Sequence, residues 1–167
     1  DAKSGRLLRT LRGHTKLINS IVINPDGTRI ASGGHDRTIR IWDTESGEQL
    51  RMVQSDGGVI TSLAINGDGS RLVSGDAYQS ATIWDTRDLK PVKTLKGHSA
   101  SVSSVDISSD GKHVVSASGD IIRIWDAMSG EEVQRLKGHT GTILTVAFHF
   151  KATRIVSGSS DKTIKIW

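Results

Sequence analysis

The chain has 167 residues, of which 35% are hydrophobic and 4% aromatic, with 18 glycines and two prolines, so it is rich in turns without the composition of a disordered chain. Its formal net charge of +4 comes from Lys and Arg interleaved with Asp and Glu, without a run of like charge, and this counts against a dedicated nucleic-acid surface. The chain has no cysteine and no apolar stretch near the length of a membrane span, which excludes a disulfide framework and thiolate-bound metals and leaves no membrane helix to consider.

Four tryptophans define an internal repeat. They lie at Trp42, Trp84, Trp125 and Trp167, with spacings of 42, 41 and 42 residues. A Gly-His pair precedes the tryptophan by a nearly constant interval in three units, at Gly13-His14, Gly97-His98 and Gly138-His139. A period of about 40 residues is typical of propeller blades. It predicts four repeats, at residues 1–42, 43–84, 85–125 and 126–167.

The hydrophobic period within each repeat is two, which predicts strands rather than helices. The first strand of each repeat carries the alternating pairs Ile21 and Ile23, Leu63 and Ile65, Val105 and Ile107, and Val146 and Phe148. Glycine then supplies the positive φ that closes a hairpin, at Asp26-Gly27, Asp68-Gly69 and Asp110-Gly111. The fourth repeat has Lys151-Ala152 there, so we expect a different or strained turn.

A third strand leads into each tryptophan, and a Ser-Gly turn then leads to a fourth strand. These turns are predicted at Ser4-Gly5, Ser46-Gly47 and Ser129-Gly130. Four short antiparallel strands per repeat make one propeller blade, so the predicted fold class is all-β, a β-propeller segment of four blades.

The repeating residues resemble those of the WD-repeat (WD40) family, in which each unit carries a Gly-His pair followed by a Trp-Asp pair. The dipeptide occurs at Trp42-Asp43, Trp84-Asp85 and Trp125-Asp126, and the resemblance covers the whole chain. The amino-acid sequence of residues 27–33 and 157–167 is similar to that of the regular repeat arrays in fungal and bacterial NACHT-type sensor proteins.

The resemblance gives the recurring His, Ser, Asp and Trp a structural role. It implies a buried network in which the Trp indole donates to Ser, Ser to His and His to Asp. A hydrolase needs such a triad once, whereas these residues recur, so we predict no catalytic residue. The tetrad residues are His14, Ser32, Asp36 and Trp42; Ser74 and Trp84; His98, Ser116, Asp120 and Trp125; and His139, Ser157, Asp161 and Trp167.

Two repeats depart from this pattern. The second has Asp56 in place of the histidine and Tyr78 in place of the aspartate, so its network cannot close in the usual way and we expect the loosest blade there. The third is one residue short between Asp120 and Trp125, which should tighten or distort its turn.

In this family, partners usually bind the narrower top face around the central channel. The resemblance places candidate positions three and five residues after the Gly-His histidine and just before the turn aspartate. The face that these positions build is small and nearly uncharged. Interface hot spots favour Trp, Tyr and Arg, and none of the three stands at these positions, which counts against a tight, specific site there. The positions are Leu17, Asn19, His35, Val59, Thr61, Ala77, Ser101, Ser103, Gly119, Thr142, Leu144 and Ser160.

No pattern supports a metal or a cofactor. The Gly-His histidines lie one per blade and the others are isolated, so no zinc spacing exists. No Gly-rich phosphate-binding motif is present either. We interpret the following basic residues as solvated strand positions rather than a polyanion site: Arg37, Arg40, Arg123, Lys162 and Lys165. Arg37 and Lys162 lie in turns, and they are the two that the sequence leaves open as contributors to such a site.

Four repeats should cover about half of a WD propeller, which usually has six to eight blades. Residues 1–12 align with 126–137, so we expect the chain to begin with an outermost strand and to end on the third strand of the fourth repeat. Such open edges invite pairing. We favour a homodimer, with two chains head to tail in an eight-bladed ring, over a four-bladed monomer. The alternative is a longer chain whose remaining blades complete the ring.

The sequence therefore favours a non-catalytic scaffold that mediates protein–protein interaction, or the ligand-sensing module of a larger protein. The alternative is a self-assembling structural element whose main partner is another copy of itself. Nucleic-acid binding, which would weaken strongly with added salt, and enzymatic activity rank below both. The lack of cysteine mildly favours a reducing compartment, and we expect a cytoplasmic location.

Overall fold

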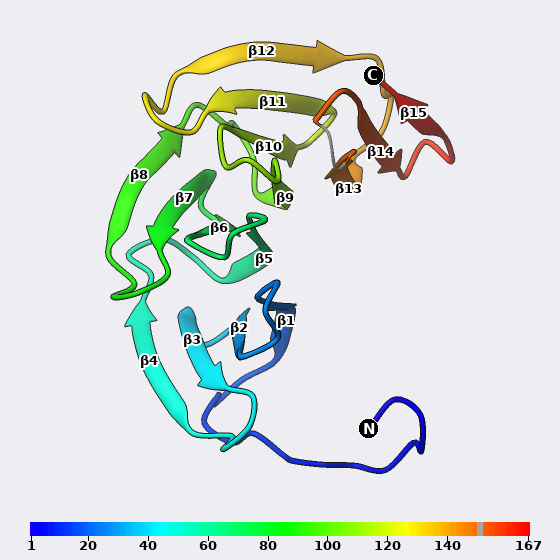
Figure 1. The fold of residues 1–167 in the computed structure, drawn as a ribbon. Helices are drawn as coiled ribbons and strands as arrows, with labels where there is room; N and C mark the ends of the chain where they lie inside the picture. Colours follow the sequence, from blue (N-terminus) through cyan, green and yellow to red (C-terminus); the bar gives the residue numbers. More distant parts are fainter. Residues whose placement is uncertain (150–151) are drawn as a thin grey trace.

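The structure is a computed structural model that describes residues 1–149 and 152–167. These residues form strands in four antiparallel sheets, with no helix among them. Figure 1 shows the sheets following one another along an open arc, with the first strand of each sheet innermost. We call the sheets blades 1 to 4. The predicted all-β fold of propeller blades is confirmed.

The strands of each blade follow chain order from the inside outward. Blade 1 contains β1 (Ile18–Ile23), β2 (Arg29–Gly34), β3 (Thr38–Asp43) and β4 (Gln49–Gln54). Blade 2 contains β5 (Ile60–Ile65), β6 (Arg71–Asp76), β7 (Ser80–Asp85) and β8 (Pro91–Lys96). Blade 3 contains β9 (Val102–Ile107), β10 (His113–Ser118), β11 (Ile121–Asp126) and β12 (Glu132–Lys137). Blade 4 has three described strands, β13 (Ile143–Phe148), β14 (Ile155–Ser159) and β15 (Ile164–Ile166).

The N-terminal segment differs from the prediction of an outermost strand at residues 1–12. Its turn does form: the Gly5 amide donates to the Asp1 carbonyl at 2.9 Å, as Gly47 donates to Asp43 at 3.0 Å before β4. Residues 6–12, however, belong to no strand. Figure 1 shows this segment beside blade 1, at the opposite end of the arc from blade 4.

The hairpin turn after each inner strand has a residue with left-handed φ at the same position in all four blades. Gly27, Gly69 and Gly111 have φ between 72° and 74°. In blade 4 the same position holds Ala152, with φ 52°, and its amide donates to the His149 carbonyl at 2.6 Å. Ala152 is therefore strained, because a Cβ disfavours left-handed φ. Lys151 lies outside the described residues.

Each inner strand carries a β-bulge near its start. In β1, Ile18 pairs with Gly34 and Ser20 with Gly33, so Asn19 is the extra residue. The same register shift makes Thr61, Ser103 and Leu144 the extra residues of β5, β9 and β13. A bulge redirects the side chain of its extra residue.

The hydrophobic core lies between neighbouring blades rather than within one. Ile39 and Ile41 of blade 1 pack with Ile60, Leu63 and Leu72 of blade 2 in one buried cluster. Equivalent clusters lie between blades 2 and 3 and between blades 3 and 4. Each blade therefore needs a neighbour on both faces to bury its apolar side chains.

The two end blades leave one such face uncovered. Ile39 is fully buried against blade 2, whereas its equivalent in blade 4, Ile164, is 76% exposed. At the other end Ile21 is 67% exposed, whereas its blade 2 equivalent, Leu63, is buried. We call the surface around Ile164 and Ile166 the blade 4 end face, and the surface around Ile18, Ile21 and Ile23 the blade 1 end face.

Candidate functional site

Blade 1 joins its four tetrad residues in one hydrogen-bonded chain. The Trp42 indole Nε1 donates to Ser32 Oγ at 2.8 Å, and Ser32 Oγ lies 2.7 Å from His14 Nε2. His14 Nδ1 lies 2.8 Å from Asp36 Oδ2. Because a carboxylate only accepts, Nδ1 is the donor to Asp36. In the tautomer that carries its proton on Nδ1, Nε2 accepts the Ser32 hydroxyl proton.

Blade 4 repeats this arrangement. Trp167 Nε1 donates to Ser157 Oγ at 2.9 Å, His139 Nε2 lies 2.8 Å from the same oxygen, and His139 Nδ1 lies 2.7 Å from Asp161 Oδ2. The network ties an inner loop, β14 and the last described strand together.

The carboxylates of these networks are held ionised. Burial raises the pKa of Asp36, but hydrogen bonds from Thr38, His14 and the Thr15 amide outweigh it and lower that pKa to about 2. For Asp161, the hydrogen bond from the Thr163 hydroxyl is the largest cause, and it lowers the pKa well below its usual range. An ionised carboxylate fixes the imidazole orientation by accepting its Nδ1 proton.

The order Asp, His, Ser is that of a hydrolase triad, but the serine oxygens are inaccessible. Ser32, Ser116 and Ser157 are all buried, Ser116 completely. Each also accepts a tryptophan indole proton. A nucleophile must reach its substrate, so this geometry supports architecture rather than acyl transfer.

Blade 3 lacks the last link of the network. His98 Nε2 lies 2.7 Å from Ser116 Oγ, and Trp125 Nε1 donates to that oxygen at 2.7 Å. Asp120 is exposed, and no hydrogen bond joins it to His98 within the described ranges 1–149 and 152–167. The expected role of Asp120 is therefore not met. The missing residue shortens the turn, where Ser118 pairs with Ile121 and Gly119 has φ 59°, and this leaves the carboxylate outside.

The loss of that carboxylate changes the chemistry of His98. Burial is the largest cause and the nearby Arg123 guanidinium the next, and together they lower the pKa of His98 to about 4. The ring is therefore neutral at physiological pH.

In blade 2, an aspartate at a different position takes the place of the missing one. Tyr78 stands where the aspartate was expected, but Asp76, two residues earlier, accepts the Ser80 hydroxyl at 2.7 Å and the Tyr78 amide at 2.7 Å. Thr38 makes the corresponding hydroxyl bond to Asp36 in blade 1. A Cβ at Gly57 would lie 2.2 Å from Asp76 Oδ2, so glycine makes room for this carboxylate.

Blade 2 has no imidazole to complete its network. Trp84 Nε1 donates to Ser74 Oγ at 2.9 Å, and Asp56 is exposed. The looseness expected of this blade stays a prediction. The sequence signal for Asp76 was an aspartate directly after the Ser74-Gly75 pair, where other repeats have glycine or serine.

Two of the basic residues taken as solvated are buried, so that interpretation was wrong for them. Arg40 is 9% exposed and Arg123 is 6% exposed. Arg40 Nε donates to Thr38 Oγ1 at 3.1 Å and Nη1 donates to Gln49, while Arg123 pairs with Glu132. Arg37 and Lys162 are exposed and Lys165 is half-buried.

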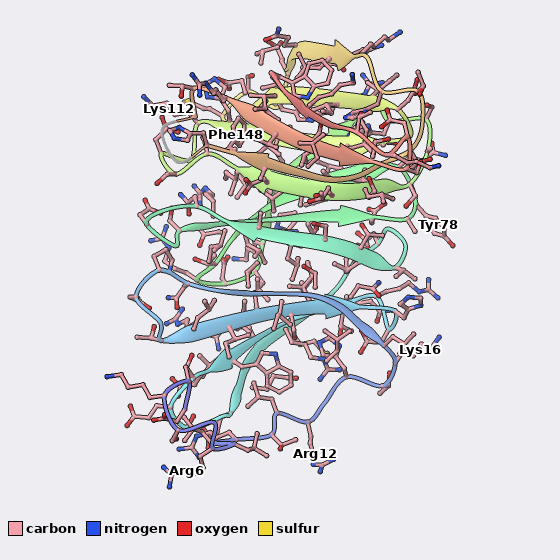
Figure 2. The ribbon with its side chains drawn as sticks, turned by 90° about the vertical axis from the view of Figure 1, so that its right-hand side faces the viewer. Arg6, Arg12, Lys16, Tyr78, Lys112 and Phe148 are labelled. Atoms are coloured by element: carbon pink, nitrogen blue, oxygen red, sulfur yellow. The ribbon has the colours of Figure 1, made fainter. Side chains whose placement is uncertain are left out.

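The candidate top-face positions lie at one rim of the arc. Figure 2 shows Lys16 and Tyr78, the chain neighbours of Leu17 and Ala77, on one side, and Lys112 and Phe148 on the other. Exposed positions occur in three blades: Leu17, Asn19 and His35; Ser101; and Thr142, Leu144 and Ser160. The half-buried ones are Val59, Thr61, Ala77, Ser103 and Gly119.

Three of these positions hold the blades together. Asn19 Nδ2 donates to the Ile60 carbonyl at 2.8 Å, Thr61 Oγ1 to Val102 at 2.6 Å, and Ser103 Oγ to Ile143 at 2.6 Å. They are the extra residues of the bulges, which aim them at the next blade. Leu144 has no such donor and is exposed. Sequence reasoning missed this role, although a polar residue recurs there in three repeats.

The repeat network, the blades and the arc agree with what a family comparison finds. The model of the WD domain, G-beta repeat (WD40) matches residues 5–43, 47–85, 89–126 and 130–167. The chain belongs to the WD40 family.

Similar proteins match this WD40 chain over short segments. Protein hir1 of Schizosaccharomyces pombe is 68% identical over 34 residues, covering 20% of this chain and 4% of that protein. The vegetative incompatibility protein HET-E-1 of Podospora anserina is 45% identical over 44 residues, covering 26% and 3%. The small ribosomal subunit protein RACK1 of Medicago sativa is 45% identical over 38 residues, covering 23% and 12%.

Solved WD40 structures match along nearly the whole chain. The structure of U3-55K has a TM-score of 0.88 at 26% identity, and the crystal structure of the RRP9 WD40 repeats has a TM-score of 0.88 at 27% identity. Each match covers 95% of this chain, but only 51% and 50% of the respective structures. The WD40 arc therefore spans about half the length of the structures it matches.

Within residues 1–149 and 152–167, no group of three or more His, Asp or Glu side chains is placed to hold a metal ion. The same residues form no helix that is long and apolar enough to cross a membrane.

Proposed function

We propose that this WD40 chain is a non-catalytic scaffold that binds protein partners. WD40 propellers generally mediate protein–protein interaction or assembly, and the family is generally non-catalytic. One observation carries the proposal: every tetrad serine is buried and accepts a hydrogen bond from a tryptophan indole. The serines of the one triad-like arrangement in the sequence therefore have a structural role. The exposed part of the top face then remains for binding.

The top face offers more than its sequence indicated. Tyr78 is 69% exposed and lies on the same side of the arc as Lys16 (Figure 2). Leu17 and Leu144 are exposed at opposite ends of this rim. Aromatic and apolar side chains on an accessible face are typical of interface anchors.

The scaffold proposal is tested by comparing the binding partners of the wild-type chain with those of two variants. A Leu17→Asp, Leu144→Asp double variant alters the top rim, and Lys112→Glu alters the opposite side as a control. Cross-linked partners quantified by mass spectrometry should be lost from the double variant and retained by Lys112→Glu. Equal retention by both variants, or equal loss from both, would overturn the top-face assignment.

A second candidate function is ring closure with another copy of this chain. The blade 4 end face carries the same isoleucines that Ile39 and Ile41 contribute between blades 1 and 2, and the blade 1 end face carries the apolar set that receives them. Thr145 stands where Ser20, Ser62 and Ser104 accept an amide from the next blade, and no described residue donates to it. Complementary end faces on one chain suit a head-to-tail dimer.

Light scattering over a dilution series tests this second candidate. A stable mass of twice 18.0 kDa supports the two-chain ring. Ile166→Asp should reduce it to a monomer, while Met128→Asp, at an exposed turn away from both end faces, should not. A folded wild-type monomer at all concentrations would favour a longer chain as the source of the missing blades. The expected cytoplasmic location stays a prediction.

A further inference from the structure

A hollow of about 660 Å³ lies where the blade 2 network is incomplete, and β4 of blade 1 contributes to its wall. It is lined by both carboxylates of the altered network, Asp56 and Asp76, and by the aromatic rings of Tyr78 and Trp84. Tyr78 lies on the top side of the arc in Figure 2. Lys96 is the one basic residue among those lining it, and no ion pair joins Lys96 to either carboxylate within the described residues.

In blade 1 the chain fills the corresponding place with its own side chains. The His14 imidazole bridges Ser32 and Asp36, and the buried Arg40 guanidinium lies beside it, with Nη2 3.8 Å from Asp36 Oδ2. Gln49 accepts from the outer side of that guanidinium. Arg123 is buried at the same position of blade 3, and blade 4 has Lys165 there.

Blade 2 keeps the anion of this arrangement but lacks the cation. Thr82 stands at the position of Arg40, and Asp56 at that of His14. Asp76 is 4% exposed, accepts bonds from Ser80 and the Tyr78 amide, and forms no ion pair within the described residues. A buried carboxylate is stabilised by a partner of opposite charge.

We propose that this hollow binds the guanidinium group of an arginine side chain of a partner protein. Two of the three sister blades place an arginine guanidinium there, so the fold accommodates this group at this position. The carboxylates of Asp56 and Asp76 supply charge-assisted acceptors. Tyr78 and Trp84 also line the hollow, and aromatic rings attract planar cations. The inference rests on the scaffold function and names a chemistry for its partner.

The direct test uses N-acetyl-arginine methylamide as the probe, with no partner protein required. Its titration should produce a saturable shift of the Trp84 indole N–H resonance in ¹H–¹⁵N spectra, while the Trp42, Trp125 and Trp167 indoles stay unshifted. The citrulline analogue has nearly the same shape without charge and should bind at least about tenfold more weakly, equal to about 1.4 kcal/mol. Equal binding of citrulline, or of the lysine analogue, would overturn the guanidinium assignment.

Two variants locate the site. Thr82→Arg places a guanidinium as in blade 1 and should abolish the shift, whereas Gln134→Arg adds the same charge on exposed β12 and should not. Asp56→Asn removes an exposed carboxylate without disturbing the core and should weaken binding several-fold. Unchanged binding by Thr82→Arg and Asp56→Asn, or no saturable shift in the wild type, would refute the proposal.

These outcomes are separable from the scaffold proposal. Failure of the arginine probe removes the hollow as a site but leaves the Leu17 and Leu144 rim to be judged by its own variants. Loss of partners from the rim variant with a positive arginine titration would support both. A positive titration without any rim-dependent partner would place recognition in blade 2 alone.

Discussion

Ser116 and Ser74 occupy equivalent positions in the two inner blades but make different hydrogen bonds. Ser116 Oγ lies within hydrogen-bond distance of both Trp125 Nε1 and His98 Nε2, whereas Ser74 Oγ, among the residues that the structure describes, accepts from Trp84 alone. Ser116→Ala should therefore leave two buried groups without a partner and cost about 2–3 kcal/mol of unfolding free energy, and Ser74→Ala about 1. Urea denaturation measures both, and equal losses would contradict the network interpretation.

His98 makes stability depend on pH. Its folded pKa of about 4 lies below the ordinary value of 6.5, so the unfolded chain binds the proton more readily. Its contribution is fully present above pH 6.5 and is lost as pH falls through 6.5 towards 4. Between pH 7.5 and 5 the loss should be about 2 kcal/mol. Urea midpoints across this range measure it.

His98→Gln is the control for that pH dependence, because Gln does not titrate. Subtracting the variant from the wild type also removes the contributions of two aspartates. These are the half-buried Asp106, whose pKa is raised by desolvation, and Asp36, whose lowered pKa acts only below about pH 4. The variant should have a flatter profile between pH 7.5 and 5. Parallel profiles would show that His98 is not the titrating group.

At the scale of single elements, the inner-strand hairpins show how one turn tolerates different residues. Ala152 holds a left-handed φ that Gly27 adopts freely. Ala152→Gly should stabilise the chain by about 0.5–1 kcal/mol, because it relieves left-handed strain at some cost in unfolded-state entropy. Thermal or urea unfolding measures this gain.

Gly27→Ala is the matched reverse change. A Cβ there would meet nothing within 4 Å, so only its φ of 74° opposes the substitution. It should cost about 1–2 kcal/mol. A destabilising Ala152→Gly together with a neutral Gly27→Ala would show that φ does not limit these turns.

At the scale of the whole molecule, two end faces on one chain give a mixing prediction that rests on ring closure. Ile21→Asp and Ile166→Asp, each alone, should be monomeric, because each disrupts both interfaces of a twofold ring. A mixture of the two variants should form heterodimers. In a heterodimer the two unaltered end faces meet at one interface, and the two altered end faces meet at the other. Light scattering of the mixture against each variant measures this, and identical masses would contradict head-to-tail pairing.

The sequence by itself determined the fold and most of the repeated network. The tryptophan spacing and period-two strands are local patterns that report blades directly, because each blade is one short segment of chain. They also indicated the tetrads of blades 1 and 4, since the interacting types recur at fixed spacing.

Only the tertiary structure decided how neighbouring blades use their side chains. The bulges turn Asn19, Thr61 and Ser103 towards the next blade, and the short blade 3 turn leaves Asp120 in solvent. The replacement of the missing carboxylate by Asp76 likewise depends on the space at Gly57. These contacts join residues about 20 to 43 positions apart, so their geometry follows from packing rather than from local sequence.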